Sequence, residues 1–296
     1  MSVINTNITS MIGQNNLRSS QSMLAQAQER LSSGLRINSA SDDAAGQAIA
    51  NKMTAQIKGM DQASRNASDG ISLVQTMEGG LDQVNDNLQR IRELAVQGAN
   101  DTNTADDRAA ITTEINERLA EIDRVAGSNN FNGTNLLNVA SGAGSTLNIQ
   151  VGSNTTDQDV ITVQRIDATV NGLGLETQAS GATAAAVVGG EFNVADASGG
   201  ATHAEFQTLI NAVDTATKSL DTNRATLGAT LNRFDSVIDN LATTTTNLSE
   251  ARSRIEDADY AVEVSNMTRA NILQQAGTSM LAQANQTPQS VLSLLG

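Results

Sequence analysis

The chain has 296 residues, a formal net charge of −14, no Cys and only 2 % aromatic residues. The excess of acidic side chains argues against nonspecific nucleic-acid binding, which needs Lys and Arg to displace counterions, and the lack of Cys excludes disulfides and thiol chemistry. A single proline in the whole chain permits very long helices, because proline breaks helix interiors.

The N-terminal end is uncharged, since residues 1–17 carry no acidic or basic side chain. They contain neither a basic n-region nor a continuous apolar core, so we expect no cleaved Sec-type signal peptide. No segment approaches the roughly 18 apolar residues that span a membrane, so no membrane partner is expected. Leu17, Leu24 and Leu31 are nevertheless spaced as on one helix face. Because a solvated helix needs a charged face, we expect this end to be disordered alone and to order against copies of itself.

A long helix from about Asp43 to Gly98 is predicted by apolar or small residues that recur with alternating steps of four and three. Its predicted N-cap is Ser41, with two aspartates near the positive end of the helix dipole. Each internal glycine costs about 1 kcal/mol relative to alanine, so we expect another helix to support this one closely at Gly59, Gly70, Gly79 and Gly80. The seam consists of Ile49, Met53, Gln56, Met60, Ala63, Ala67, Gly70, Val74, Met77, Leu81, Val84, Leu88, Ile91 and Ala95. Leu94 lies outside the seam, so it either widens the packed stripe or meets another molecule.

A second helix is predicted from about Thr104 to Ala126, with Gly127 as its stop signal. Its apolar face consists of Ile111, Ile115, Leu119, Ile122 and Val125. The next segment, residues 128–200, is rich in Gly, Asn, Ser and Thr. Within it, apolar and polar residues alternate around 147–151 and 161–163, which predicts a short β-hairpin. Residues 178–200 are low in complexity and are predicted to form a loop or a small excursion.

This middle region holds the few candidates for chemistry. His203 is the one histidine of the chain, so a zinc motif with two histidines on one helix turn is excluded. Asp157 and Asp159 lie in the predicted hairpin turn, but their spacing does not match a calcium-binding EF-hand loop, and a solvated turn is the preferred interpretation. We therefore expect no catalytic residue, no metal site and no cofactor.

The last third of the chain repeats the helical pattern. Nine apolar residues are spaced seven apart and predict one long helix: Phe206, Val213, Leu220, Leu227, Phe234, Leu241, Leu248, Ile255 and Val262. Residues 270–296 again carry no charge, although apolar residues continue at Leu273, Met280, Val291 and Leu294. Both ends are therefore predicted to be assembly surfaces that join copies of the chain.

Four motifs, in order, resemble bacterial flagellin: LSSGLRINSASDDAAGQAIA (31–50), LQRIRELAVQGAN (88–100), INERLAEIDRVAGSNNFNG (115–133) and the segment from SRIEDADY to QSVLSLL (253–295). The resemblance covers about the first 175 and the last 90 residues. It implies a mainly α fold: a long antiparallel coiled-coil bundle from both chain halves, a small β-hairpin region in the middle, and termini that pair as a second helical domain.

The same resemblance implies a division into three parts. Residues 1–42 with 256–296 would form the inner coiled-coil assembly core, and residues 43–175 with 204–255 the helical bundle with its hairpin. A short insert, residues 176–203, would stand where other flagellins carry outer domains. The implied function is a structural subunit that is exported unfolded through the flagellum by a type III apparatus and polymerises into the extracellular filament, without enzymatic activity.

Partners also follow from the resemblance. Copies of the chain, the flagellar cap and hook-junction proteins are implied, together with an export chaperone on the segment from Ile255 to Leu295. Flagellins of this kind are detected by a host Toll-like receptor through residues that match Arg90, Leu94 and Glu114, although contacts to neighbouring protofilaments are the preferred primary role of this surface. The alternatives are a hook–filament junction protein, disfavoured by the LQRIRELAVQ and NNFNG motifs, and a secreted coiled-coil adhesin or effector.

Overall fold

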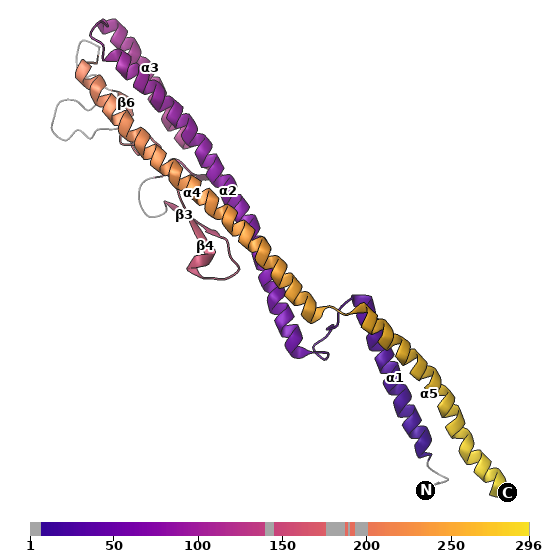
Figure 1. Ribbon diagram of the computed structural model, residues 1–296. Helices are drawn as coiled ribbons and strands as arrows, with labels where there is room; N and C mark the ends of the chain where they lie inside the picture. Colours follow the sequence, from indigo (N-terminus) through magenta and orange to yellow (C-terminus); the bar gives the residue numbers. More distant parts are fainter. Residues whose placement is uncertain (1–6, 140–144, 176–186, 189, 193–200, 296) are drawn as a thin grey trace. The chain divides into compact units, whose positions relative to one another are not determined.

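The computed structural model describes residues 7–139, 145–175, 187–188, 190–192 and 201–295, with the side chains of 188 and 287–295 left aside. It is mainly α-helical, as predicted (Figure 1). The helices are α1 (Ile8–Ser33), α2 (Ala44–Gly98), α3 (Ala105–Ser128), α4 (His203–Glu256) and α5 (Tyr260–Leu295), with a 3-10 turn, η1 (Asp157–Asp159). The strands form three antiparallel pairs: β1 (Asn130–Phe131) with β2 (Thr134–Asn135), β3 (Thr146–Gln150) with β4 (Val160–Gln164), and β5 (Val187–Val188) with β6 (Glu191–Phe192).

The chain divides into two compact units. The terminal unit consists of residues 1–58 and 244–296, and the central unit of residues 59–243. Both α2 and α4 contribute residues to each unit, so neither unit is a continuous stretch of chain. Each unit is described by itself below.

The core of the central unit is the seam predicted from periodicity. Every seam position of α2 from Met60 to Ala95 is buried, and the predicted apolar face of α3 is buried beside it. The heptad positions of α4 from Phe206 to Leu241 are also buried. Apolar residues that repeat every 3.5 residues keep one face of each helix against its partners. The apolar faces of α2, α3 and α4 together form this core (Figure 1).

Three of the four α2 glycines that were expected to need close support lie where another part of the chain approaches closely. A Cβ on Gly70 would stand 2.7 Å from the ring of Phe234 on α4, and one on Gly80 would stand 2.5 Å from Leu137 Cδ1. A Cβ on Gly59 would stand 2.9 Å from Ser153 Cβ, in the segment that joins β3 to η1. The expected support by another helix is therefore found at Gly70, whereas at Gly59 and Gly80 the close neighbour is a non-helical segment. Gly79 meets nothing within 4 Å, so the expectation of close support is wrong at this position.

The N-terminal caps of α2 and α3 are formed by aspartate and threonine side chains. The N-cap of α2 is Asp43, whose Oδ1 accepts from Gly46 N at 2.9 Å, so the prediction of Ser41 is wrong. The helix begins later because Asp42 accepts from the amides of Asn38 and Ser39 and holds that segment as a turn. At α3, Thr104 and Asp107 form a capping box. The hydroxyl and amide of Thr104 donate to the Asp107 carboxylate and lower its pKa.

The helix ends also differ from the sequence expectation. Gly127 lies inside α3, which continues to Ser128 with Asn129 as its C-cap. The predicted single helix from Phe206 to Val262 is wrong beyond Glu256, because residues 257–259 interrupt it. Leu35 and Asp257 form an isolated antiparallel bridge, and Asp259 Oδ1 accepts from Ala261 N at 2.9 Å to start α5. Val262 therefore belongs to α5 and is exposed.

The predicted β-hairpin is confirmed. β3 pairs with β4 in the register that sets Leu147 opposite Val163 and Ile149 opposite Ile161, so the alternating apolar residues share one face. The pair of β5 and β6 does not follow from the sequence pattern, because it lies in the low-complexity segment that is predicted to form a loop or a small excursion. Phe192 of β6 is buried and its ring packs 5.4 Å from that of Phe206.

Candidate functional site at the paired chain ends

The two ends of the chain lie side by side as antiparallel helices, α1 and α5, in the terminal unit (Figure 1). The N-cap of α1 is Asn7, whose Oδ1 accepts from Ser10 N at 3.0 Å, and its C-cap is Gly34, which adopts the left-handed conformation (φ 74°). Small residues let the helices approach closely. A Cβ on Gly13 would lie 3.3 Å from Leu281 Cγ, and one on Gly277 would lie 3.4 Å from Leu17 Cδ1.

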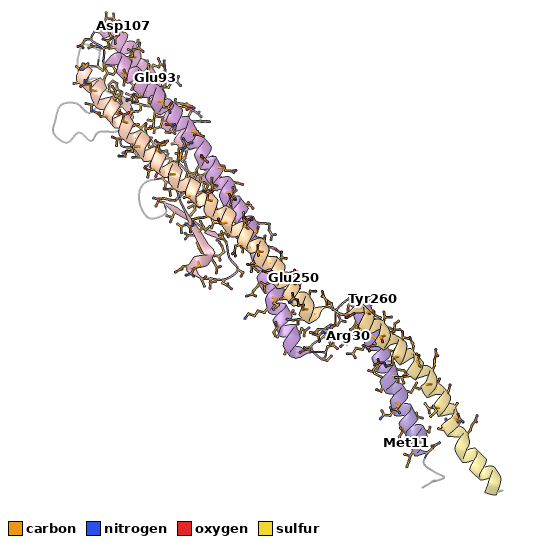
Figure 2. The ribbon with its side chains drawn as sticks, viewed as in Figure 1. Met11, Arg30, Glu93, Asp107, Glu250 and Tyr260 are labelled. Carbon is orange, nitrogen blue, oxygen red and sulfur yellow. The ribbon has the colours of Figure 1, made fainter. Side chains whose placement is uncertain are left out.

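The pair buries small side chains and leaves large apolar ones in solvent. Ala27 and Ala270 are buried, whereas Leu17, Leu24 and Leu31 are only half-buried. Met280 is 67 % exposed and Leu273 43 % exposed. Further exposed apolar residues on these helices are Ile8, Met11, Ile12, Met23 and Ile272; Figure 2 labels Met11. The predicted assembly residues Val291 and Leu294 lie outside the described side chains.

One ion pair joins the helices at the end near the bridge. Arg30 Nη1 donates to Glu263 Oε1 at 3.1 Å, and Asn266 Nδ2 donates to Glu263 Oε2 at 3.4 Å. The Glu263 side chain is only 8 % exposed. Beside it a cavity of about 230 Å³ is lined by Met23, Ala27, Arg269, Ala270 and Leu273, among others. Charge is otherwise sparse here, since α1 carries only Arg18, Glu29 and Arg30, and α5 only Glu263 and Arg269.

The predicted receptor or protofilament surface lies on α2 and α3 of the central unit. Arg90 Nη2 donates to Glu114 Oε1 at 2.8 Å, and Arg90 Nη1 donates to Glu93 Oε2 at 3.2 Å. These hydrogen bonds, of which the one to the Glu114 carboxylate has the largest effect, raise the pKa of Arg90. Leu94 is only 2 % exposed, so of its two predicted roles it takes the first and widens the packed stripe. Arg90 and Glu114 are thus brought together at the surface of the central unit, whereas Leu94 is buried in its core.

The remaining candidates have structural surroundings. His203 is the first residue of α4, and its ring nitrogens Nδ1 and Nε2 are hydrogen-bonded to Ala99 O and Gln207 Nε2. Asp159 accepts a hydrogen bond from the Thr156 hydroxyl at 2.7 Å. Within the described ranges, His, Asp and Glu nowhere gather in a group of three or more that would hold a metal. Among the same residues, no helix is both long and apolar enough to cross a bilayer.

The long helices, the exposed apolar side chains on the paired ends and the buried apolar core of the central unit are typical of a structural subunit that associates through its helices. Comparison with known proteins identifies its family. The model of the bacterial flagellin N-terminal helical region matches residues 4–141, and that of the C-terminal helical region matches residues 210–295. The chain belongs to the bacterial flagellin family, the structural proteins of the extracellular flagellar filament.

Individual relatives agree along the whole length. The chain is 49 % identical to a flagellin of Xenorhabdus nematophila, 46 % to one of Serratia marcescens and 42 % to one of Halalkalibacterium halodurans, with 99 % of each chain covered. Among solved structures, a putative flagellar hook-associated protein from Vibrio parahaemolyticus shares the fold. Its TM-score is 0.55 at 16 % identity, covering 73 % of this chain and all of that one.

Proposed function

We propose that the paired ends are the assembly core of a filament subunit, in which the exposed apolar side chains of α1 and α5 pack against neighbouring copies. The observation that carries this proposal is the combination of two charge-free segments with exposed large apolar residues such as Met11, Ile272 and Met280. A two-helix pair cannot cover this surface itself, and contiguous exposed apolar area marks interaction sites. Its neighbours in the polymer would remove it from water.

The proposed division of the chain follows from the same features. The assembly core consists of residues 1–42 with 256–296, and the interruption at 257–259 supports its second boundary. Residues 43–175 with 204–255 form the helical bundle with its hairpin. Residues 176–203 are the short insert, of which residues 187–188, 190–192 and 201–203 lie within the described structure.

Assembly is tested by sedimentation of purified protein seeded with filament fragments. We expect the full chain to pellet and the chains lacking residues 1–17 or 270–296 to stay in solution with the helices of 43–255 folded. Met280→Gln should reduce pelleting, because it places an amide in a surface that becomes dry, whereas Met280→Leu is the matched control that keeps the apolar area. Filaments retained by both truncated chains would contradict the proposed assembly core.

Export and capping complete the proposed life of the subunit. An export chaperone first binds the segment from Ile255 to Leu295, and the chain then passes unfolded through the flagellum. Hook-junction proteins bind at the base of the filament and cap proteins at its growing tip. The uncharged ends support this route, because apolar segments without a charged face fold only once partners cover them. Circular dichroism of unseeded and polymerised protein tests whether the ends become ordered only on assembly, since helix content should then rise when the protein polymerises. Equal helix content in both states would show that the ends are already folded in the monomer.

A second proposed role concerns monomers that leave the filament. The exposed Arg90–Glu114 pair is a surface that a host Toll-like receptor would contact, with protofilament contacts as its primary role and Leu94 supporting it from within. Reporter cells that express the receptor test this, and Arg90→Ala with Glu114→Ala should weaken the response. Arg92→Ala is the matched control, because Arg92 is an equally exposed arginine of α2 that pairs with Asp214 at 2.6 Å. Equal responses from both variants would exclude the proposed surface.

The hook–filament junction remains the alternative within the same class. Electron microscopy of cells with and without the gene, together with assembly of the purified chain, separates the two. A filament subunit forms filaments by itself in the seeded assay, whereas a junction protein does not. A secreted adhesin or effector would leave the filament intact in both strains.

A further inference from the structure

The register between the two ends of the chain is nearly constant along the pair. Asn7 Nδ2 donates to Ala284 O at 2.7 Å at one end, and Leu35 bridges Asp257 at the other. Between them Gly13 faces Leu281 and Leu17 faces Gly277, so each step forward on α1 is matched by an equal step back on α5. Such a uniform register needs a cause, because the buried side chains are small and alike.

The packing residues themselves do not select this register. Leu17, Leu24 and Leu31 repeat every seven residues on α1, as do Gly277 and Ala270 on α5. Sliding one helix by seven residues therefore sets leucine against a small residue once more, with nearly the same apolar contact. Identical repeats leave the register of the two helix faces degenerate unless a polar group between them breaks the symmetry, as single polar residues do in coiled coils. The bridge between Leu35 and Asp257 restrains the register as well, but it lies outside the helices.

Glu263 is the position at which the α5 repeat changes. It stands seven residues before Ala270 and fourteen before Gly277, and it introduces a buried carboxylate where the pattern offers small residues. In the observed register Arg30 covers it. A slip of seven residues in one direction would set Met23 against Glu263, and a slip in the other would set Arg30 against Ala270. Either slip leaves a buried charge without its partner, which is strongly unfavourable.

We propose that the Arg30–Glu263 pair determines the register in which the two ends of this chain pair with each other. The pair is poorly suited to a purely stabilising role, since Arg30 Nε is buried without a hydrogen-bond partner and buried ion pairs are often no more stable than apolar replacements. Its contribution is specificity. The inference rests on the proposed function only in that the ends pair as an assembly core.

The register can be read by disulfide trapping, because the chain has no cysteine of its own. An ideal Cβ at Gly277 lies 3.9 Å from Leu17 Cβ, close to the mean of about 3.8 Å in disulfides. Leu17→Cys with Gly277→Cys therefore reports the observed register. Leu24→Cys with Gly277→Cys and Leu17→Cys with Ala270→Cys report the two slipped registers, because seven residues displace a helix position by about 10 Å.

Each cysteine pair is placed in the full chain, in three backgrounds, and oxidised after seeded assembly. With Arg30 and Glu263 present, we expect the observed-register pair to crosslink at least ~tenfold faster than the slipped pairs. In Arg30→Met with Glu263→Met, thermal stability should hold while the ratio falls to about one. The reversed pair, Arg30→Glu with Glu263→Arg, should restore the ratio, a result that a requirement for mere side-chain bulk would not produce.

The proposal is overturned if the double-methionine background keeps the parent ratio, if charge reversal fails to restore it, or if the parent crosslinks mainly in a slipped register. Pelleting is scored in the same samples and reports the proposed assembly separately. A chain that crosslinks in the observed register but never pellets supports the register pair and refutes the assembly core. A parent chain that pellets but crosslinks equally in all registers supports the assembly core and refutes the register pair.

Discussion

Gly79 and Gly80 are neighbours on α2 with opposite surroundings, and alanine at each should change stability in opposite directions. A Cβ at Gly79 meets nothing within 4 Å, so Gly79→Ala adds only helix propensity. That gain is about 1 kcal/mol. For a domain of this size it raises Tm by about 2–4 °C.

Gly80→Ala has the same propensity gain but meets buried atoms. Its Cβ would overlap Leu137 Cδ1 and the amide of Asn129, which donates to Thr76 O at 3.0 Å. Overpacking costs about 1–3 kcal/mol and loss of the hydrogen bond about 0.5–1.5 kcal/mol, against the gain of about 1 kcal/mol. The net destabilisation is therefore about 0.5–3.5 kcal/mol.

Urea unfolding of unseeded full-length protein, followed by circular dichroism at 222 nm, measures both changes. The midpoint should rise for Gly79→Ala and fall for Gly80→Ala with the slope unchanged. In a Leu137→Val background the penalty of Gly80→Ala should shrink, because the shorter side chain leaves room for the methyl group. Shifts of the same sign at both glycines would refute the close approach at Gly80.

Three further outcomes are expected. Leu119→Ala should destabilise the central unit by about 2–5 kcal/mol in the same urea assay, while Val96→Ala, at a half-exposed site, should stay within about 0.5 kcal/mol; equal losses would contradict the burial. Because the pKa of Asp107 is lowered in the folded chain, its cap is intact above the ordinary value of 3.8 and is lost as pH falls through the lower folded pKa. Asp107→Asn should therefore reduce the acid sensitivity of amide exchange at the start of α3, and an unchanged profile would count against the cap. Asn116→Ala should speed amide exchange at Phe192, whose N–H donates to Asn116 Oδ1 at 2.6 Å, whereas Asn116→Asp keeps an acceptor and should retain protection.

Much of the fold was predictable because helix and strand periodicities are local. The α2 seam from Met60 to Ala95, the face of α3 and the β3–β4 alternation follow from spacing alone. The two helix faces are buried, as are Ile161 and Val163 of β4, whereas Leu147 and Ile149 of β3 are partly buried. The uncharged ends are likewise visible in the chain, and with them the candidate assembly site. Spacing reports which residues share a face, and it needs no knowledge of what covers that face.

Other features depend on contacts between distant residues. The heptad continues past Glu256, yet the helix stops there because Leu35 bridges Asp257 across more than 200 residues. β5 and β6 form in a low-complexity segment because Phe192 packs on Phe206 and its backbone is bonded to Asn116. No sequence pattern distinguishes Gly79 from Gly80, and they differ only in the atoms that surround them in the folded chain.

The sequence by itself determined the helical repeats, the hairpin and the charge-free ends, since each is a pattern within a short stretch of chain. Only the tertiary structure decided which seams meet, that Leu94 lies inside the packed stripe, and that Arg30 covers Glu263. The physical reason is that a repeat of seven residues specifies a face but is the same after every slip of seven. The choice among slips is made by individual side chains that lie far apart along the chain.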